Sequence, residues 1–249
     1  MVEVTNNDTA AQEDLKQTLE KGEISLQGQF LLGSNYTFLV TVKYRDFAYP
    51  AVYKPTRGEQ PLWDFPEASL AGREVAAYLV SEALGFGLVP LTVLCNGPYG
   101  PGSLQQFIEY NPNYHYFNFK PADRQRLRPV VLFDLLVNNA DRKGSHVFFQ
   151  KRTRHLFGID HGLCFHADDK LRTVLWDFSG ESIPEELLVA VRSIFQVSDS
   201  STESLTAKLG AYLTGDEIAA LRARAEALLA NPVFPHPPQD RRSFPYPPL

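Results

Sequence analysis

Cysteine, methionine and long apolar runs are scarce in this sequence, which has two cysteines and one methionine among 249 residues. Two isolated thiols, Cys95 and Cys164, cannot build the disulfide framework of a small secreted domain, and they favour a reducing compartment. No apolar run reaches the roughly 18 residues of a membrane span. The first residues are polar and acidic, not basic and then apolar, so we expect no secretory signal and a cytoplasmic location.

An excess of positive charge is also lacking. The formal net charge is -5, with 24 Lys and Arg against 29 Asp and Glu, so no overall positive field attracts nucleic acid. A basic cluster at residues 151–154 is typical of a charged hairpin tip. The composition, 44% hydrophobic and 21% charged, is that of an ordinary folded protein, long enough for one large domain or a two-lobed one.

The periodicity of apolar residues predicts a β-rich first part and an α-rich second part. Strands are predicted from alternation and short apolar runs over residues 24–27, 36–44, 49–54, 88–94, 103–110, 147–150 and 155–159. Helices are predicted over residues 14–21, 67–84 with Gly85 at C′, 122–137 with a break at Pro129, a stretch opened by Pro184, 201–213, and 214–230 with a capping box.

This order predicts an α+β fold of two lobes with the active cleft between them. The N-lobe, residues 1–110, holds a sheet and one helix and binds nucleotide, and the C-lobe, residues 111–230, is mostly helical. Residues 231–249 hold seven of the eighteen prolines and form a Pro-rich tail. We expect this tail to be extended and polyproline-like, either packed on the body or available for docking a protein partner.

Two acidic residues follow apolar segments in the middle of the chain. Asp141 lies in the segment 133–146 (FDLLVNNADRKGSH), after its apolar first residues. Asp160 lies in the segment 159–162 (IDHG), directly after a predicted strand. Two carboxylates aimed at one point suit metal-assisted phosphoryl transfer, in which one orients the acceptor hydroxyl and the other holds the cation. Taken alone, the same segments fit a capped loop and an ordinary turn equally well.

Residues in the first part could bind phosphate. Lys54 ends a strand, where its ammonium can pair with phosphates or simply extend to water. Glu74, on the following helix, could hold that lysine or be a solvated helix charge. The turn at 28–33, with Ser34 and Asn35 after it, could present backbone N–H groups to phosphates, although most such turns are only hairpins.

A group of histidines offers a different reading. His155, His161, Cys164 and His166 lie within twelve residues, and imidazole with thiolate suits Zn²⁺. Their spacing is not that of a familiar zinc finger, so partly buried loop residues are the alternative.

Taken in order, these segments resemble the phosphatidylinositol 3/4-kinase-like branch of the protein kinase fold, and most nearly the type II phosphatidylinositol 4-kinases. The resemblance spans about residues 24–165 in collinear order. It is carried by the segments 51–55 (AVYKP), 74–80 (EVAAYLV) with 84–90 (LGFGLVP), 102–109 (GSLQQFIE), 133–142 and 159–163 (IDHGL).

The resemblance implies an ATP-dependent phosphotransferase that moves the γ-phosphate to a hydroxyl of a small molecule or protein, with Mg²⁺ or Mn²⁺. Lys54 would bind the phosphates with Glu74 as its partner, and Phe107 and Ile108 would line the adenine pocket. The implied ATP-binding residues are Ser34, Asn35, Lys54, Glu74, Phe107 and Ile108. No basic patch or amphipathic insertion favours an inositol lipid as the acceptor.

The resemblance also assigns the reacting groups. Asp141 would orient or deprotonate the acceptor hydroxyl, and Asp160 would hold the cation. His146 stands where the family has an asparagine as second metal ligand. Because imidazole binds Mg²⁺ poorly, the second metal position is weakened, altered toward Mn²⁺, or lost. Two alternatives therefore stay open: a nucleotide-binding pseudokinase that regulates or scaffolds, and transfer of the nucleotide instead of the γ-phosphate.

Overall fold

The computed structural model describes residues 6–30, 35–194 and 204–249. By their internal contacts the residues form two compact units. The first contains Met1–Ala71 and Pro90–Ile108, and the second contains Gly72–Val89 and Glu109–Leu249. The domain division at residue 110 and the separate tail stay predictions, and the contacts group the segment Gly72–Val89 with the second unit.

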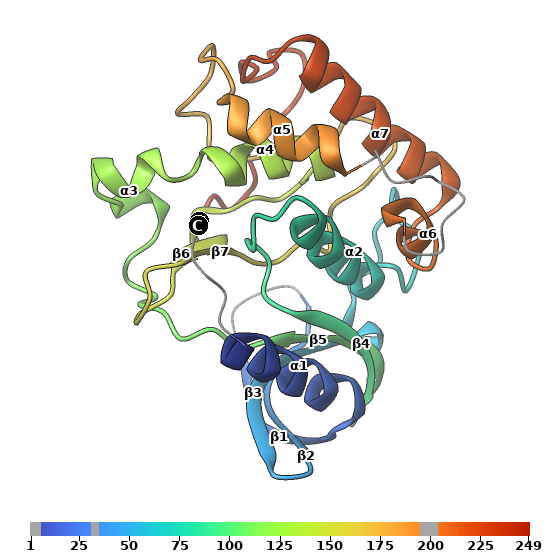
Figure 1. Cartoon of the computed structure of the whole chain (residues 1–249). Helices are drawn as coiled ribbons and strands as arrows, with labels where there is room; N and C mark the ends of the chain where they lie inside the picture. Colours follow the sequence, from blue (N-terminus) through green and yellow to red (C-terminus); the bar gives the residue numbers. More distant parts are fainter. Residues whose placement is uncertain (1–5, 31–34, 195–203) are drawn as a thin grey trace. The chain divides into compact units, whose positions relative to one another are not determined.

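The first unit is built on an antiparallel sheet with strand order β1-β2-β3-β5-β4. Its strands are β1 Glu23–Phe30, β2 Thr37–Tyr44, β3 Phe47–Pro55, β4 Thr92–Gly97 and β5 Gly100–Gln106. A helix, α1 Asn6–Lys21, lies against the sheet (Figure 1). The first three predicted strands are confirmed and pair in chain order, and α1 begins earlier than predicted.

The core of this unit follows from the alternation in β2. Phe38, Val40 and Val42 are buried and pack with Leu15 and Leu19 of α1. Successive residues of a strand point to opposite faces, so the intervening Leu39 and Thr41 face away from this core. The same register places Lys54 opposite Ser103 across the β3–β5 pair.

Among the element boundaries that differ from the prediction, such as β5 ending at Gln106 and not at residue 110, two have a clear local reason. The strand expected at 88–94 begins at Thr92, after Pro90, which has no N–H to give to a sheet ladder. The helix expected from residue 67 is α2 Leu70–Ala83, because Ala68 has a positive φ of 61° that a helix does not allow. Its end is as predicted, since Gly85 has a φ of 68°.

The second unit contains helices, 3₁₀ turns and a two-stranded ribbon. Its elements after α2 are η2 Tyr116–Asn118, α3 Pro121–Gln125, α4 Arg128–Val137, η3 Gly144–His146, β6 Val147–Phe149, β7 Leu156–Gly158, α5 Glu185–Ser193, α6 Leu205–Leu209 and α7 Gly215–Ala230. Helices α4, α5 and α7 pack together (Figure 1), and α4 contributes a nearly continuous buried surface that includes Leu132, Phe133 and Leu136.

The predicted helices of this unit are confirmed with two changes. The helix expected over 122–137 is divided into α3 and α4, with Pro129 in the first turn of α4, where a missing N–H costs no helical bond. The helix expected over 201–213 is the shorter α6, and residues 201–203 lie outside the described part. The capping box of α7 is confirmed, since Thr214 Oγ1 accepts from the Glu217 N–H and Glu217 Oε2 accepts from the Thr214 N–H.

The Pro-rich tail is extended and packed on the second unit. Phe234 is buried. Its N–H donates to the Glu181 carbonyl at 2.9 Å, and its carbonyl accepts from the Gly180 N–H at 2.8 Å. Farther along, the Ser243 carbonyl accepts from the Thr173 N–H at 3.0 Å. Within the residues described, we find no helix with the length and apolar character that a bilayer crossing requires.

Candidate active site

The loop that carries Asp141 begins where α4 ends. Asn138 has left-handed φ and ψ angles of 54° and 56°, a conformation that asparagine tolerates better than most residues. Its side-chain amide donates to the carbonyls of His166 and Asp168, and its side-chain oxygen accepts from the Lys170 N–H. Asn138 therefore fixes both the end of the helix and the segment opposite it.

The next residue, Asn139, holds the backbone of Asp141. Its side-chain oxygen accepts from the Asp141 N–H at 2.9 Å, and its amide nitrogen donates to Asp134 at 3.1 Å. Asn139 is fully buried. A short polar side chain bonded to the backbone two residues on is a turn that asparagine favours, so the backbone N–H of Asp141 is held by a neighbour in its own loop.

Arg142 connects this loop with the turn that carries Asp160. Its guanidinium donates to both oxygens of Asp134, at 2.8 and 2.9 Å, and it also donates to the carbonyl of Ile159 at 2.8 Å and that of His146 at 3.2 Å. Sequence reasoning gave no role to Arg142 or Asp134. The signal available was an arginine next to the candidate base, but its complete burial is not readable from the sequence.

Asp160 and His146 lie side by side. His146 Nε2 is 3.2 Å from Asp160 Oδ2, and the Ile159 N–H donates to the His146 carbonyl at 3.0 Å. Asp160 has a left-handed φ of 63°, unusual for a residue other than glycine and energetically costly. The backbone contacts around it hold that conformation.

The carboxyl of Asp141 has a different pKa from that of a carboxyl in water. Burial, reinforced by the nearby charge of Asp160, raises the pKa of Asp141 to about 6. The ammonium of Lys143, 3.3 Å from Asp141 Oδ2, acts in the opposite direction, as does Arg172. A carboxylate with a pKa near the working pH is suited to accepting a proton.

Helix α2 supports the turn after Asp160. Glu74 is buried, and its Oε2 accepts from the His161 N–H at 3.0 Å. Its neighbour Arg73 donates to the Cys164 carbonyl at 2.6 Å and forms a buried ion pair with Glu217 of α7. The predicted partner of Glu74, Lys54, belongs to the first unit, so that pairing stays a prediction.

The other predicted ATP-binding residues lie in the first unit. Asn35 Oδ1 accepts from the Gln60 N–H at 2.8 Å, which holds Asn35 against the segment after β3. Phe107 donates its N–H to Pro50 at 3.2 Å, and Ile108 is buried just after β5. Ser34 lies outside the described residues. In the same unit, the segment after β3 borders a cavity of about 250 Å³, whose lining combines apolar residues with Thr56, Glu59, Gln60 and Glu67.

The spacing of Asp160 and His146 fits two ligands of one divalent cation. Two neighbouring ligands of an octahedral Mg²⁺ or Mn²⁺ ion lie roughly 3 Å apart, and the contact between Asp160 Oδ2 and His146 Nε2 is 3.2 Å. Across the described residues, no cluster of three or more His, Cys, Asp or Glu side chains is placed to hold a metal. A cation at this pair would therefore complete its coordination with water and phosphate oxygens, which is usual for Mg²⁺.

The alternative zinc group does not assemble. The His155 ring contacts the Gly87 carbonyl at 2.9 Å, the His161 ring contacts Arg142 at 2.7 Å, and Cys164 is fully buried. These residues and His166 all lie in the described part, where no such metal cluster is found. The reading of them as partly buried loop residues fits their contacts better.

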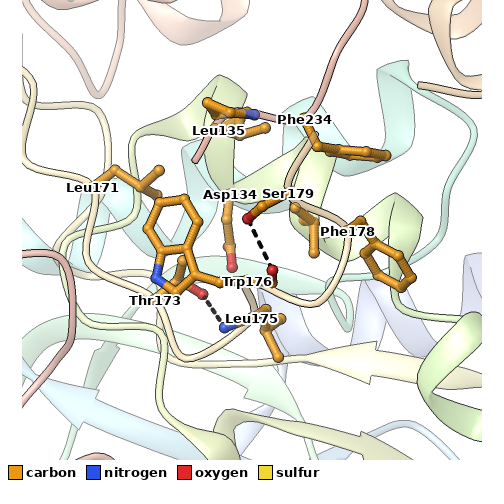
Figure 2. Close-up of a pocket in the computed structure, with 11 residues that line it drawn as sticks. Asp134, Leu135, Leu171, Thr173, Leu175, Trp176, Phe178, Ser179 and Phe234 are labelled. Atoms are coloured by element: carbon orange, nitrogen blue, oxygen red, sulfur yellow. Dashed lines mark hydrogen bonds between the residues drawn. The ribbon is translucent and has the colours of Figure 1, made fainter. Parts of the chain in front are cut away.

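A small cavity adjoins Asp134 (Figure 2). Its volume is about 10 Å³, and Trp176, Phe178 and Phe234 contribute to its walls. That volume is room for about one water molecule. The cavity is too small for a nucleotide, so it is a packing feature behind the Asp134–Arg142 pair and not a substrate site.

Comparison with known proteins supplies the family. The family model described as phosphatidylinositol 3- and 4-kinase matches residues 72–207, more than half of the chain. Protein Rv2133c of Mycobacterium tuberculosis is 37% identical over 270 aligned positions, covering 94% of this chain and 95% of its own. The matched family region includes Asp141, His146 and Asp160.

Solved structures agree at the level of the fold. The Helicobacter pylori proinflammatory kinase CtkA superposes with a TM-score of 0.51 at 12% identity, covering 87% of this chain and 94% of its own. The Golgi casein kinase with Mn/ADP bound superposes with a TM-score of 0.52 at 15% identity, covering 90% and 75%. The predicted α+β, two-lobed, protein-kinase-like fold is thereby confirmed. Together with the match over residues 72–207, this means that the chain belongs to the phosphatidylinositol 3- and 4-kinase family.

Proposed function

We propose that this protein is an ATP-dependent phosphotransferase that moves the γ-phosphate of ATP to a hydroxyl group of a small molecule or protein. The acceptor oxygen forms a bond to the γ-phosphorus, the bond from that phosphorus to the bridging oxygen breaks, and ADP leaves. The hydroxyl proton passes to Asp141. The supporting observation is the pair of adjoining acidic positions, Asp141 and Asp160, in loops that the buried Arg142 ties together.

Each remaining residue has a role in this proposal. Asp160 and His146 would hold Mg²⁺ or Mn²⁺, which when bound neutralises charge on the phosphate oxygens. Lys54, with Glu74 as its partner, would bind the phosphates. The segment with Ser34 and Asn35 would cover the triphosphate, and Phe107 and Ile108 would line the adenine pocket. The Mn/ADP-bound state of the Golgi casein kinase supports a nucleotide with a divalent ion.

The test uses labelled ATP and single substitutions. Asp141→Asn should abolish turnover while keeping ATP affinity, whereas Asp160→Asn should lose both turnover and cation-dependent ATP binding. Asp168→Asn is the matched control, because Asp168 is an exposed carboxylate of the same unit. Full turnover in both Asp141→Asn and Asp160→Asn would show that the proposal is wrong. Release of label from the α-phosphate instead of the γ-phosphate would point to nucleotide transfer.

A second candidate is a nucleotide-binding pseudokinase that acts as a regulator or scaffold. The observation that favours it is His146, an imidazole facing Asp160 at 3.2 Å in place of the amide that the resemblance implies. Saturable ATP binding in Mg²⁺ and in Mn²⁺, with no hydrolysis and no transfer to the protein itself, would favour this candidate. The Pro-rich tail would then be the segment to test for protein partners.

A further inference from the structure

The Pro-rich tail reaches the loop between Asp141 and His146. The Gly144 N–H donates to the Pro248 carbonyl at 2.8 Å. The two residues are far apart in sequence, and both belong to the second unit. Gly144 is also packed against the ring of Phe117, whose nearest atom would lie 2.7 Å from an added Cβ. The loop is therefore held from two directions at one glycine.

A segment at residues 172–174 connects the loop and the tail a second time. The Arg142 N–H donates to the Arg172 carbonyl at 3.0 Å, and the Val174 N–H donates to the Arg142 carbonyl at 3.1 Å. The intervening Thr173 N–H donates to Ser243 of the tail at 3.0 Å. Because successive residues of an extended chain turn their N–H groups to opposite sides, the segment bonds the loop with one side and the tail with the other.

Side chains anchor the tail at this place. Arg241 donates to the Leu171 carbonyl at 2.8 Å and pairs with Asp169 at 2.6 Å. The Trp176 indole N–H donates to the Ser243 carbonyl at 3.3 Å, and Pro245 is buried. An extended chain that is bonded along its length in this manner has lost conformational entropy. The tail is therefore an ordered part of the second unit.

The tail contacts backbone and leaves the acidic side chains accessible. The Asp141 side chain keeps 27% of its surface exposed and the Asp160 side chain 47%, with the tail in place. An inhibitory cover would bury these groups. We propose that residues 241–248 are a positioning element of the active site, which fixes the backbone at Gly144 and Thr173 and thereby orients Asp141 toward its substrate.

The catalytic consequence of this inference rests on the proposed function. The decisive comparison is Gly144→Pro with Gly144→Ala in the full chain. Both variants add a Cβ near Phe117, but proline alone removes the N–H that Pro248 accepts. Proline fits the backbone, since Gly144 begins a 3₁₀ turn and Lys143 before it is extended, with φ of −89° and ψ of 164°.

In ATP turnover with Mn²⁺, Gly144→Pro should lower kcat about tenfold relative to Gly144→Ala, because a small misplacement of a reacting group is costly. The KM for ATP should differ by less than about twofold between the two variants, since ground-state binding is untouched. Equal kcat values overturn the proposal. A higher kcat in the proline variant also overturns it, because the tail would then be inhibitory.

A measurement that needs no activity accompanies the kinetics. Arg241→Ala should loosen the tail, so peptides covering residues 141–147 and 171–176 should exchange their amide hydrogens faster than in the wild type. Arg192→Ala, on α5, is the control and should leave both peptides unchanged. Unchanged exchange in Arg241→Ala overturns the positioning role by itself. An inactive wild type with faster exchange in Arg241→Ala would remove the proposed function and leave the holding of the loop supported.

Discussion

Arg142 and Asp134 form an ion pair that is closed to solvent, with side-chain exposures of 0% and 2%. Both carboxylate oxygens of Asp134 accept hydrogen bonds from Arg142. The third guanidinium nitrogen of Arg142 donates to the carbonyls of Ile159 and His146. The pair is placed between α4 and the two loops that carry Asp141 and Asp160. Stability and site geometry therefore depend on the same interaction.

Arg142→Met should destabilise the fold by about 3–5 kcal/mol, because it leaves the Asp134 charge buried without its partner. The measurement is chemical denaturation followed by circular dichroism. Arg192→Met is the control, since Arg192 pairs with Glu185 on the surface and such pairs contribute less than about 1 kcal/mol. A loss for Arg142→Met no larger than that of the control would contradict the role given to the buried pair.

A second buried pair connects α2 with α7. Arg73 pairs with Glu217, which also accepts from the Thr214 N–H in the capping box. Thr214→Ala removes the cap alone and should cost about 1 kcal/mol. Glu217→Ala removes the ion pair and the carboxylate that accepts from the Thr214 N–H, while the N–H of residue 217 can still donate to Thr214 Oγ1. It should cost clearly more, about 3 kcal/mol or above. The comparison is made by denaturation midpoints, and equal losses would mean that the ion pair adds no stability.

The sequence predicted those features that depend on local pattern. Alternation located β2, the capping box located the start of α7, and Gly85 marked the end of α2. These signals act between residues a few positions apart. The grouping of Asp141, Asp160 and His146 was also expected, because the two short strands between His146 and Asp160 form an antiparallel pair that returns the chain to one place.

Burial of particular charges was not predictable. Arg142 and Asp134 are eight residues apart, and nothing in their spacing says that both are closed to water. The tail gave a similar result. Its prolines predicted an extended chain, but its partners Thr173 and Gly144 are remote in sequence. They bond through backbone atoms, which every residue type has, so the residue types do not reveal these contacts.

The imidazole beside Asp160 should change the preference among cations. Nitrogen ligands are accepted by Mn²⁺ more readily than by Mg²⁺, so His146→Asn should lower the ratio of ATP affinity in Mn²⁺ to that in Mg²⁺ by about tenfold. Calorimetric titration of ATP in each ion measures this ratio. His166→Asn is the control, because the His166 imidazole lies 3.9 Å from Asp168 and is not one of the proposed cation ligands. An unchanged ratio in His146→Asn would remove His146 from the proposed cation site.

Both thiols should be unreactive in the folded protein. Burial raises the pKa of Cys95 to about 12, and it raises the pKa of the enclosed Cys164 well above its ordinary value. Since the thiolate is the reactive form, alkylation at pH 7 should be slow until denaturant is added, after which two thiols should react. Rapid labelling of one thiol in native buffer, located by peptide mass, would contradict the burial described.

Asp141 should make activity and stability respond to pH in opposite directions. Its pKa is about 6 in the fold and 3.8 ordinarily, so between these values the folded state binds more protons than the unfolded chain. The stability that this group contributes is complete below pH 3.8 and is lost as pH rises toward 6. By linkage the loss is at most about 3 kcal/mol.

The proposed transfer needs the ionised carboxylate, so turnover should rise with pH through about 6, where the stability contribution has been lost. Asp141→Asn cannot ionise there. Between pH 4 and pH 7 the wild type should therefore lose stability relative to Asp141→Asn, as measured by the free energy of unfolding from denaturation at each pH. A difference that is flat over this range, or that moves toward the wild type, would show that Asp141 is not held in the proton-binding environment on which its role as the base depends.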